Sequence, residues 1–138
     1  KIRKEIDTWV EEQNETVNYL YLLFKEQNRG YYIKEISEEQ CQQIENSNDV
    51  YVFGAGRIAY EMAVVLNQME KEILAYIVSD YTSENPKAIY GVPVIKIGDL
   101  ENIDKDALVI VATLPRYYDG ITNTLRKYGI SNILKIIN

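Results

Sequence analysis

Residues 50–59 read VYVFGAGRIA, and this stretch decides the expected fold. Its first four residues are β-branched or aromatic, which favours a short β-strand. Gly54, Gly56 and Ala59 then match the pattern G-x-G-x-x-A, between that strand and a helix predicted to begin at Arg57. A strand, a glycine turn and a helix in this order are typical of the first βα unit of a nucleotide-binding α/β domain.

A physical requirement explains why each of these positions carries a small residue. Gly54 permits the tight turn off the strand, Gly56 lets a phosphate approach the backbone, and Ala59 lets the helix sit close to the strand. The helix N-terminus offers unpaired N–H groups and a partial positive charge, which favour an anion. The predicted phosphate-binding residues are Gly54, Ala55, Gly56, Arg57 and Ile58. The alternatives are a turn that serves packing and, for Arg57, a solvated side chain.

Three residues further along the chain are predicted at the same site. Asp80 ends the second expected strand, 21 residues after Ala59, where a carboxylate can bind a ribose diol and favours NAD over NADP. Thr113 and Arg116 follow the fourth expected strand, at the edge where open α/β sheets bind ligands. The alternatives are a turn role for Asp80 and, for the other two, initiation of a helix with Pro115 in its first turn.

Strands and helical segments alternate through residues 49–138. The expected strands are residues 50–53, 73–78, 92–97, 107–113 and 133–137. One helix is expected from Arg57 to Met69, and the last one carries the apolar stripe Tyr117, Ile121, Leu125 and Tyr128 before it stops at Gly129. This alternation predicts a parallel sheet with right-handed crossovers. We therefore expect an α/β fold, a reduced Rossmann-like sheet of about five strands in the order 3-2-1-4-5.

Residues 1–48 are predicted to form a helical extension. Their first part has the period of an amphipathic helix, with apolar residues at Ile2, Ile6, Trp9, Val10, Val17, Leu20, Tyr21 and Phe24. Gly30 follows as a stop signal. A second helix begins after Ser37, because Gln40 completes a capping box, and ends at residues 46–48. These helices either pack on the sheet or join it to a neighbouring domain or chain.

Composition excludes several classes of function. The 138 residues include no His and one Cys, which removes His-based catalysis, a His-ligated metal site and an internal disulfide. Fifteen basic and 21 acidic residues give a net charge of −6, which argues against nucleic-acid binding. The longest apolar runs, residues 19–24 and 107–112, are far shorter than the ~20 residues of a membrane span. We expect no metal, no nucleic acid, no membrane span and a cytoplasmic location.

Residues 49–138 resemble the small Rossmann-like accessory domain of bacterial sugar-nucleotide and surface-polysaccharide enzymes. Four segments that occur in order carry the resemblance: residues 50–56, 76–80, 89–95 and 108–113. Similar modules precede the left-handed helix of PglD-type sugar acetyltransferases and the catalytic domain of CapD-type dehydratases, and accompany some glycosyltransferases and methyltransferases. The resemblance implies a nucleotide or sugar-nucleotide site at Gly54, Gly56 and Asp80. The chain departs from the pattern at Arg57, where a small residue is common, and at Ser79, where an acid is usual.

The expected function is a nucleotide-binding module of a larger bacterial surface-glycan enzyme, with no catalytic residue of its own. Its ligand would be a sugar nucleotide or NAD, and its partners the further domains of the same protein. The chain begins with Lys, and we expect it to be a piece of that larger protein. One alternative is an NAD-dependent oxidoreductase fragment acting on a sugar nucleotide. The other is a structural domain with a vestigial site, forming a homodimer through the apolar helix around residues 17–24.

Overall fold

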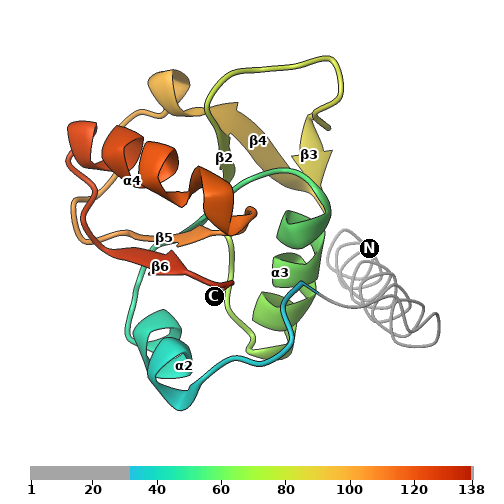
Figure 1. Ribbon diagram of the computed structural model, residues 1–138, viewed down its shortest axis with the longest axis vertical. Helices are drawn as coiled ribbons and strands as arrows, with labels where there is room; N and C mark the ends of the chain where they lie inside the picture. Colours follow the sequence, from blue (N-terminus) through green and yellow to red (C-terminus); the bar gives the residue numbers. More distant parts are fainter. Residues whose placement is uncertain (1–31, 138) are drawn as a thin grey trace, which may run out of the picture.

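The computed structural model describes residues 32–137, which form a six-stranded sheet with helices around it (Figure 1). The strands are β1 Val50–Phe53, β2 Tyr76–Val78, β3 Ala88–Ile89, β4 Val92–Lys96, β5 Leu108–Val111 and β6 Ile133–Lys135. They lie in the order β3-β4-β2-β1-β5-β6, and every neighbouring pair is parallel except β3 with β4. The expected α/β class with a mostly parallel sheet is therefore confirmed.

The prediction of five strands in the order 3-2-1-4-5 was wrong in its count and at one edge of the sheet. The additional strand, β3, has two residues and pairs with β4 through a tight hairpin at Tyr90 and Gly91. Both hairpin residues have positive φ, 49° and 80°, as a two-residue hairpin turn requires. Pattern reasoning missed β3 because two residues are too few to show an alternation of side chains.

Strand β2 is also shorter than predicted, since it begins at Tyr76 and not at Ile73. Ile73 and Ala75 are nevertheless buried, and the N–H of Leu74 donates to the carbonyl of Val50 over 2.9 Å. The apolar run thus marks burial along the sheet, while regular pairing with the neighbouring strands starts only at Tyr76.

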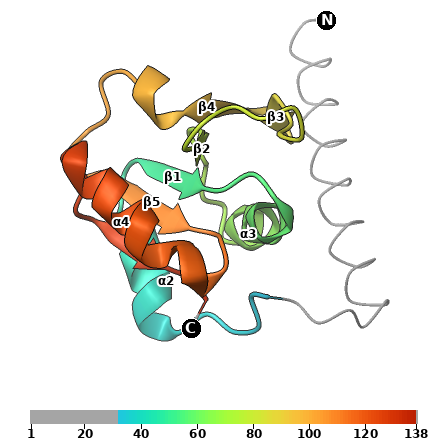
Figure 2. The same ribbon diagram turned by 45° about the horizontal axis from the view of Figure 1, so that its top comes forward.

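Helices cover both faces of the sheet (Figure 2). Helix α3, Arg57–Gln68, and helix α2, Glu38–Glu45, pack on the face that contains Val50 and Val52 of β1. Helix α4, Tyr118–Lys127, packs on the opposite face, against Tyr51 and Phe53. All four residues of β1 and all four of β5 are buried, as expected of strands covered on both faces.

The predicted helix signals are confirmed at two helices. Helix α2 has the expected capping box: the N–H of Gln40 donates to Ser37 Oγ over 3.1 Å, and the N–H of Ser37 donates to Gln40 Oε1 over 2.9 Å. Helix α3, predicted from Arg57 to Met69, is observed from Arg57 to Gln68 and buries Ile58, Met62 and Leu66. Local capping and periodicity are therefore sufficient to place these helices.

The stripe predicted for the last helix was partly wrong. Ile121 and Leu125 are buried, but Tyr117 and Tyr128 are about half exposed, and Tyr118 is buried in their place. A 3₁₀ turn, η2 (Pro115–Tyr117), precedes α4. A 3₁₀ turn has three residues per turn and an α-helix has 3.6, so the side chains that face the sheet differ from those expected for one continuous α-helix.

Of the predicted helical extension, the structure describes only the last part. Residues 32–36 precede α2 without helical structure, and Ile44 of α2 is fully buried in the core beside β1 and β5. The amphipathic helix expected from Ile2 to Phe24 and its stop at Gly30 lie outside the described residues. The division into residues 1–48 and 49–138 stays a prediction.

The last strand is held to the start of α4 by one side chain. Tyr118 Oη donates to the carbonyl oxygen of Ile137 over 2.6 Å and accepts the N–H of the same residue over 2.9 Å. Two hydrogen bonds from a buried hydroxyl thus hold the backbone that leaves β6 against helix α4.

We expect the fold to lose stability in alkali because of its buried tyrosines. Burial raises the pKa of four phenols above the ordinary value: Tyr51, Tyr76, Tyr90 and Tyr118. These groups keep their protons in the folded protein at a pH where the unfolded chain loses them, so the free energy of unfolding falls above about pH 10. Urea unfolding followed by circular dichroism between about pH 8 and 12 measures this fall. A Tyr76→Phe variant should show a shallower decline, and a pH-independent midpoint would contradict the prediction.

Candidate functional site

The glycine turn leaves β1 directly beside the end of β5. Gly54 has a φ of +128°, a conformation that residues with a side chain rarely adopt, and its N–H donates to the carbonyl of Ile77 over 2.8 Å. A Cβ at this position would lie 2.7 Å from the carbonyl oxygen of Ala112 and 3.3 Å from Thr113 Cγ2. Gly54 is therefore required by the packing of the turn, whether or not a ligand binds.

Gly56 differs from Gly54 both in its φ angle and in the space around it. It is the N-cap residue of α3, with a φ of −102°, and a Cβ built on it would meet no described atom within 4 Å. Having no side chain, Gly56 cannot itself cap the first N–H groups of this helix. Open space beside the N-terminal amides of a helix is the arrangement that an anion needs there.

The other residues of the turn contribute mainly through the backbone. Ile58 is 7% exposed and belongs to the core under α3, and Ala55 packs against the same core. Ala59 is fully buried, in agreement with the close contact of helix and strand expected from its small side chain. Neither the Ile58 nor the Ala55 side chain carries a polar group, so any contact of these two residues with an anion would come from their N–H groups.

Arg57 extends along α3 toward a buried carboxylate. Its Nε lies 3.5 Å from Glu61 Oε2, and its guanidinium carbon lies 5.4 Å from the centre of the Tyr32 ring. Glu61 is only 4% exposed, and its Oε1 accepts the N–H of Ile33 over 3.1 Å. Oε2 is buried and accepts no hydrogen bond from the described residues, so the nearby guanidinium charge compensates this carboxylate.

Sequence reasoning missed Glu61. A single glutamate in a helix normally lies in solvent, and nothing in the composition of α3 marks this one as buried. The signal that was present is its spacing of four residues from Arg57, which brings the two side chains together on one face of a helix. The same pair holds Tyr32 and Ile33 against the helix.

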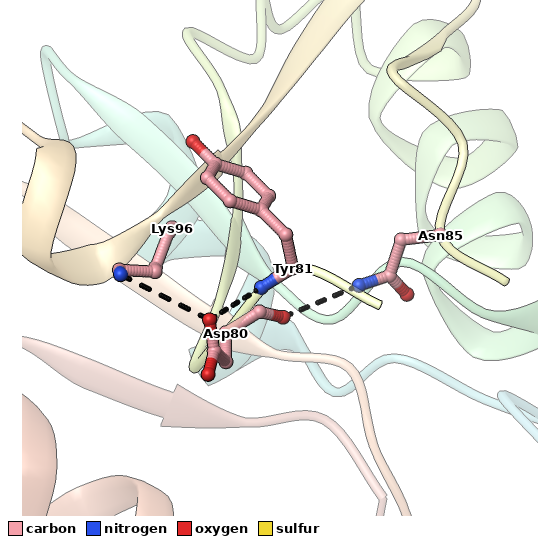
Figure 3. A network of polar contacts seen from close by, with 4 residues as sticks. All are labelled: Asp80, Tyr81, Asn85 and Lys96. Carbon is pink, nitrogen blue, oxygen red and sulfur yellow. Dashed lines mark hydrogen bonds and ion pairs between the residues drawn. The ribbon is translucent and has the colours of Figure 1, made fainter. Parts of the chain in front are cut away.

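Asp80 lies in an exposed polar network at the end of β2 (Figure 3). Its Oδ1 accepts the N–H of Tyr81 over 2.9 Å and lies 3.9 Å from Lys96 Nζ, while its carbonyl accepts Asn85 Nδ2 over 3.4 Å. The Asp80 side chain is 80% exposed. A solvated carboxylate at this position is accessible to the hydroxyls of a ligand, and Lys96 from β4 places a cation beside it, which sequence reasoning missed.

A surface pocket of about 440 Å³ lies between the ends of β1 and β2 and helix α4. Its lining comes from the strand ends, from η2 and from α4: Phe53, Ser79, Arg116, Tyr117, Gly120, Ile121 and Thr124. The Arg116 guanidinium carbon lies 4.8 Å from the centre of the Tyr117 ring, which is half exposed. The volume is within the range of ligand pockets, and an aromatic ring beside a cation suits a planar ligand group.

The structure thus brings the predicted site residues to one edge of the sheet and divides them among three places. Residues 54–58 form the turn, Asp80 belongs to the polar network, and Arg116 lines the pocket. Thr113 lies beside Gly54, and its Oγ1 donates to the carbonyl of Leu114 over 3.3 Å. All of them follow the carboxyl ends of β1, β2 and β5, where ligands of open α/β sheets bind.

Two further findings bear on the type of site. In the described part of the chain, no group of three or more His, Cys, Asp and Glu side chains is placed to hold a metal ion. Within residues 32–137, none of the helices combines the length and the apolar character needed to cross a bilayer.

No family model, curated protein or solved structure matches this chain. The resemblance to the accessory domain of sugar-nucleotide enzymes therefore stays a prediction.

The two glycines of the turn should respond differently to the same substitution. Gly54→Ala places a methyl group 2.7 Å from a backbone oxygen at a positive φ, and we expect the free energy of unfolding to fall by roughly 2–3 kcal/mol. Gly56→Ala meets open space at an ordinary φ, so its change should stay within about 0.5–1 kcal/mol. Urea unfolding of both variants measures the difference, and equal losses would contradict the steric account.

Proposed function

We propose that the carboxyl edge of the sheet binds a nucleotide, as a sugar nucleotide or NAD, through its diphosphate. The observation that carries this proposal is Gly56, a glycine that no described contact and no unusual φ requires, at the N-terminus of the 12-residue helix α3. A side chain at this position would occupy the space that a phosphate needs beside the amides. Gly54 alone would not support the proposal, because packing explains it.

The topology supports the same position. Of the strands, β4-β2-β1-β5-β6 are parallel and in the order of a reduced Rossmann-like sheet, which is the finer fold assignment that we propose. The chain leaves β1 toward α3 on one face and leaves β5 toward α4 on the other. Because the segments that follow β1 and β5 turn toward opposite faces of the sheet, a crevice is expected between the ends of these two strands. Doubly wound sheets bind their ligands in such a crevice.

The nucleoside would lie along the same edge. Asp80 would accept hydrogen bonds from the ribose hydroxyls. The positive charge of Lys96 beside it would offset part of the repulsion between the Asp80 carboxylate and a negatively charged group on the ligand. The pocket beneath α4 would take the base, with the half-exposed Tyr117 ring as a stacking surface next to Arg116. Together these groups would recognise the diphosphate, the ribose and the base of a nucleotide.

The proposal is therefore a binding module, acting in the cytoplasm as part of a larger bacterial surface-glycan enzyme. An NAD-dependent oxidoreductase fragment would share the nucleotide site but needs a proton donor beside the reacting carbon. A structural domain with a vestigial turn is the competing hypothesis, and Gly54 fits it equally well. The homodimer expected from the helix around residues 17–24 concerns residues outside the described part.

Calorimetric titration with UDP-glucose, GDP-mannose, NAD and NADP tests the proposal. We expect at least one of them to bind, and Gly56→Asp to weaken that binding at least about tenfold, because a carboxylate then occupies the anion position. The matched control is Ser131→Asp, which adds the same charge at an exposed residue before β6, at the opposite edge of the sheet. If none of the four ligands binds the unmutated protein, the nucleotide site is rejected.

Glu61 should limit the affinity of this site, because its carboxylate competes with the ligand for Arg57. In Glu61→Gln the amide oxygen can still accept the N–H of Ile33, while the negative charge beside Arg57 is lost. We expect the nucleotide that binds to do so roughly 3–10 times more tightly.

The gain should disappear in the double variant Glu61→Gln, Arg57→Gln, since the ligand then has no guanidinium to recruit. Calorimetry measures the nucleotide affinity of Glu61→Gln, of Arg57→Gln and of the double variant, which together form a double-mutant cycle with the unmutated protein. A gain that persists without Arg57 would contradict the competition between carboxylate and phosphate.

A further inference from the structure

Helix α4 contains a glycine that neither its conformation nor its packing requires. Gly120 lies in the first turn of the helix with an ordinary helical φ. A Cβ built on it would meet no described atom within 4 Å beyond its chain neighbours and the backbone of its own helix. Glycine within a helix is less favourable than alanine, because its backbone loses more conformational freedom on folding. A side chain at this position would therefore stabilise the fold, and the glycine needs another explanation.

The pocket beneath α4 supplies that explanation. Gly120 lines this pocket of about 440 Å³ together with Arg116, Tyr117 and Thr124. Open space where a Cβ would lie, at a residue that borders the pocket, leaves the backbone of α4 accessible to a flat ring. The half-exposed Tyr117 ring, with the Arg116 guanidinium carbon 4.8 Å from its centre, is a second flat group at the same place. The pocket is thus shaped for a planar ligand group.

Two polar side chains of the pocket lining have opposite hydrogen-bonding capacities. Arg116 is exposed, and its guanidinium can only donate hydrogen bonds. Thr124 is partly exposed, and its hydroxyl donates its proton to the carbonyl of Gly120 over 2.9 Å. The Thr124 oxygen can therefore only accept a hydrogen bond from a ligand. The Ser79 hydroxyl can act in either sense and does not discriminate between ligands.

Nucleobases differ in the edge that such a pair of groups can recognise. Uracil and guanine present a lactam, in which a carbonyl oxygen that accepts lies beside a ring N–H that donates. Cytosine and adenine present the reverse, an exocyclic amine that donates beside a ring nitrogen that accepts. Against Arg116 and Thr124, this second edge would set donor against donor and acceptor against acceptor, and polar groups left without partners weaken binding.

We propose that the pocket beneath α4 recognises the lactam edge of a nucleobase, so that the ligand is a uracil or guanine nucleotide. The carbonyl oxygen of the base would accept a hydrogen bond from Arg116, and the lactam N–H would donate to Thr124 Oγ1. The ring would lie against the backbone at Gly120. This inference rests on the proposed nucleotide site and adds the choice of base, which separates these nucleotides from NAD, whose base is adenine.

Calorimetry with UDP-glucose, CDP-glucose, GDP-glucose and ADP-glucose tests the choice of base. We expect UDP-glucose to bind at least about tenfold more tightly than CDP-glucose, or GDP-glucose than ADP-glucose, because only the first of each pair has the lactam. Arg116→Met removes the donors from an unbranched side chain and should reduce this preference to within about threefold. The matched control is Arg126→Met, which removes an exposed guanidinium of the last turn of α4, outside the pocket lining, and should preserve the preference.

Substitution of Gly120 separates a ligand role from a structural one. Gly120→Ala should raise the urea midpoint of unfolding, because alanine favours a helix, yet weaken binding of the preferred nucleotide about fivefold by narrowing the pocket. The matched control is Asn123→Ala, which also raises helix propensity in α4 but at an exposed residue outside the pocket lining. It should raise the midpoint and leave the affinity unchanged.

The outcomes distinguish this inference from the proposed function. Equal affinity within both pairs, tighter binding of CDP-glucose or ADP-glucose than of its partner, or a preference that survives in Arg116→Met would overturn the choice of base and leave the nucleotide site in place. Binding of NAD with no binding of UDP-glucose or GDP-glucose would do the same. If none of these ligands binds the unmutated protein, the nucleotide site itself is rejected, and the choice of base with it.

Discussion

The close approach of the glycine turn to strand β5 is the constraint on which the rest of the structure depends. β1 and β5 pair along all four residues of each strand, and the pairing ends where Gly54 lies against the carbonyl of Ala112. Any side chain at Gly54 would displace the turn from β5. Because α3 begins directly after Gly56, such a displacement would also move the helix N-terminus and the position at which an anion can bind.

The same geometry explains why the two edges of the sheet differ. At the carboxyl edge, α3 and α4 leave toward opposite faces, and the turn, Asp80 and the pocket beneath α4 all lie along this edge. Arg57 connects this edge to the buried carboxylate of Glu61 and, through it, to Ile33. At the amino edge, no crossover helix of the described chain joins β2 to β4, and a hollow lies beside Tyr76 and Tyr90. The difference between the two edges therefore follows from how the strands are connected.

Prediction from sequence succeeded where a signal is complete within a few residues. The capping box of Ser37 and Gln40 starts α2, and Gly129, with a φ of +82°, follows the end of α4. Prediction failed where an element has too few residues to show a pattern, or where the preceding turn changes which side of a helix faces the sheet. Strand β3 has two residues, and η2 shifts the stripe of α4 so that Tyr118 is buried and not Tyr117.

The sequence by itself determined the alternation of strands and helices, the position of the glycine turn and the edge of the sheet at which the candidate residues gather. These features follow from local propensities, apolar periodicity and the connection rules of parallel strands. Only the tertiary structure decided that Gly54 is required by packing, that the Glu61 carboxylate is buried against the N–H of Ile33, and that the buried Tyr90 hydroxyl has no hydrogen-bond partner among the described residues. Each of these depends on atoms from segments far apart in the chain, whose distances no local pattern encodes.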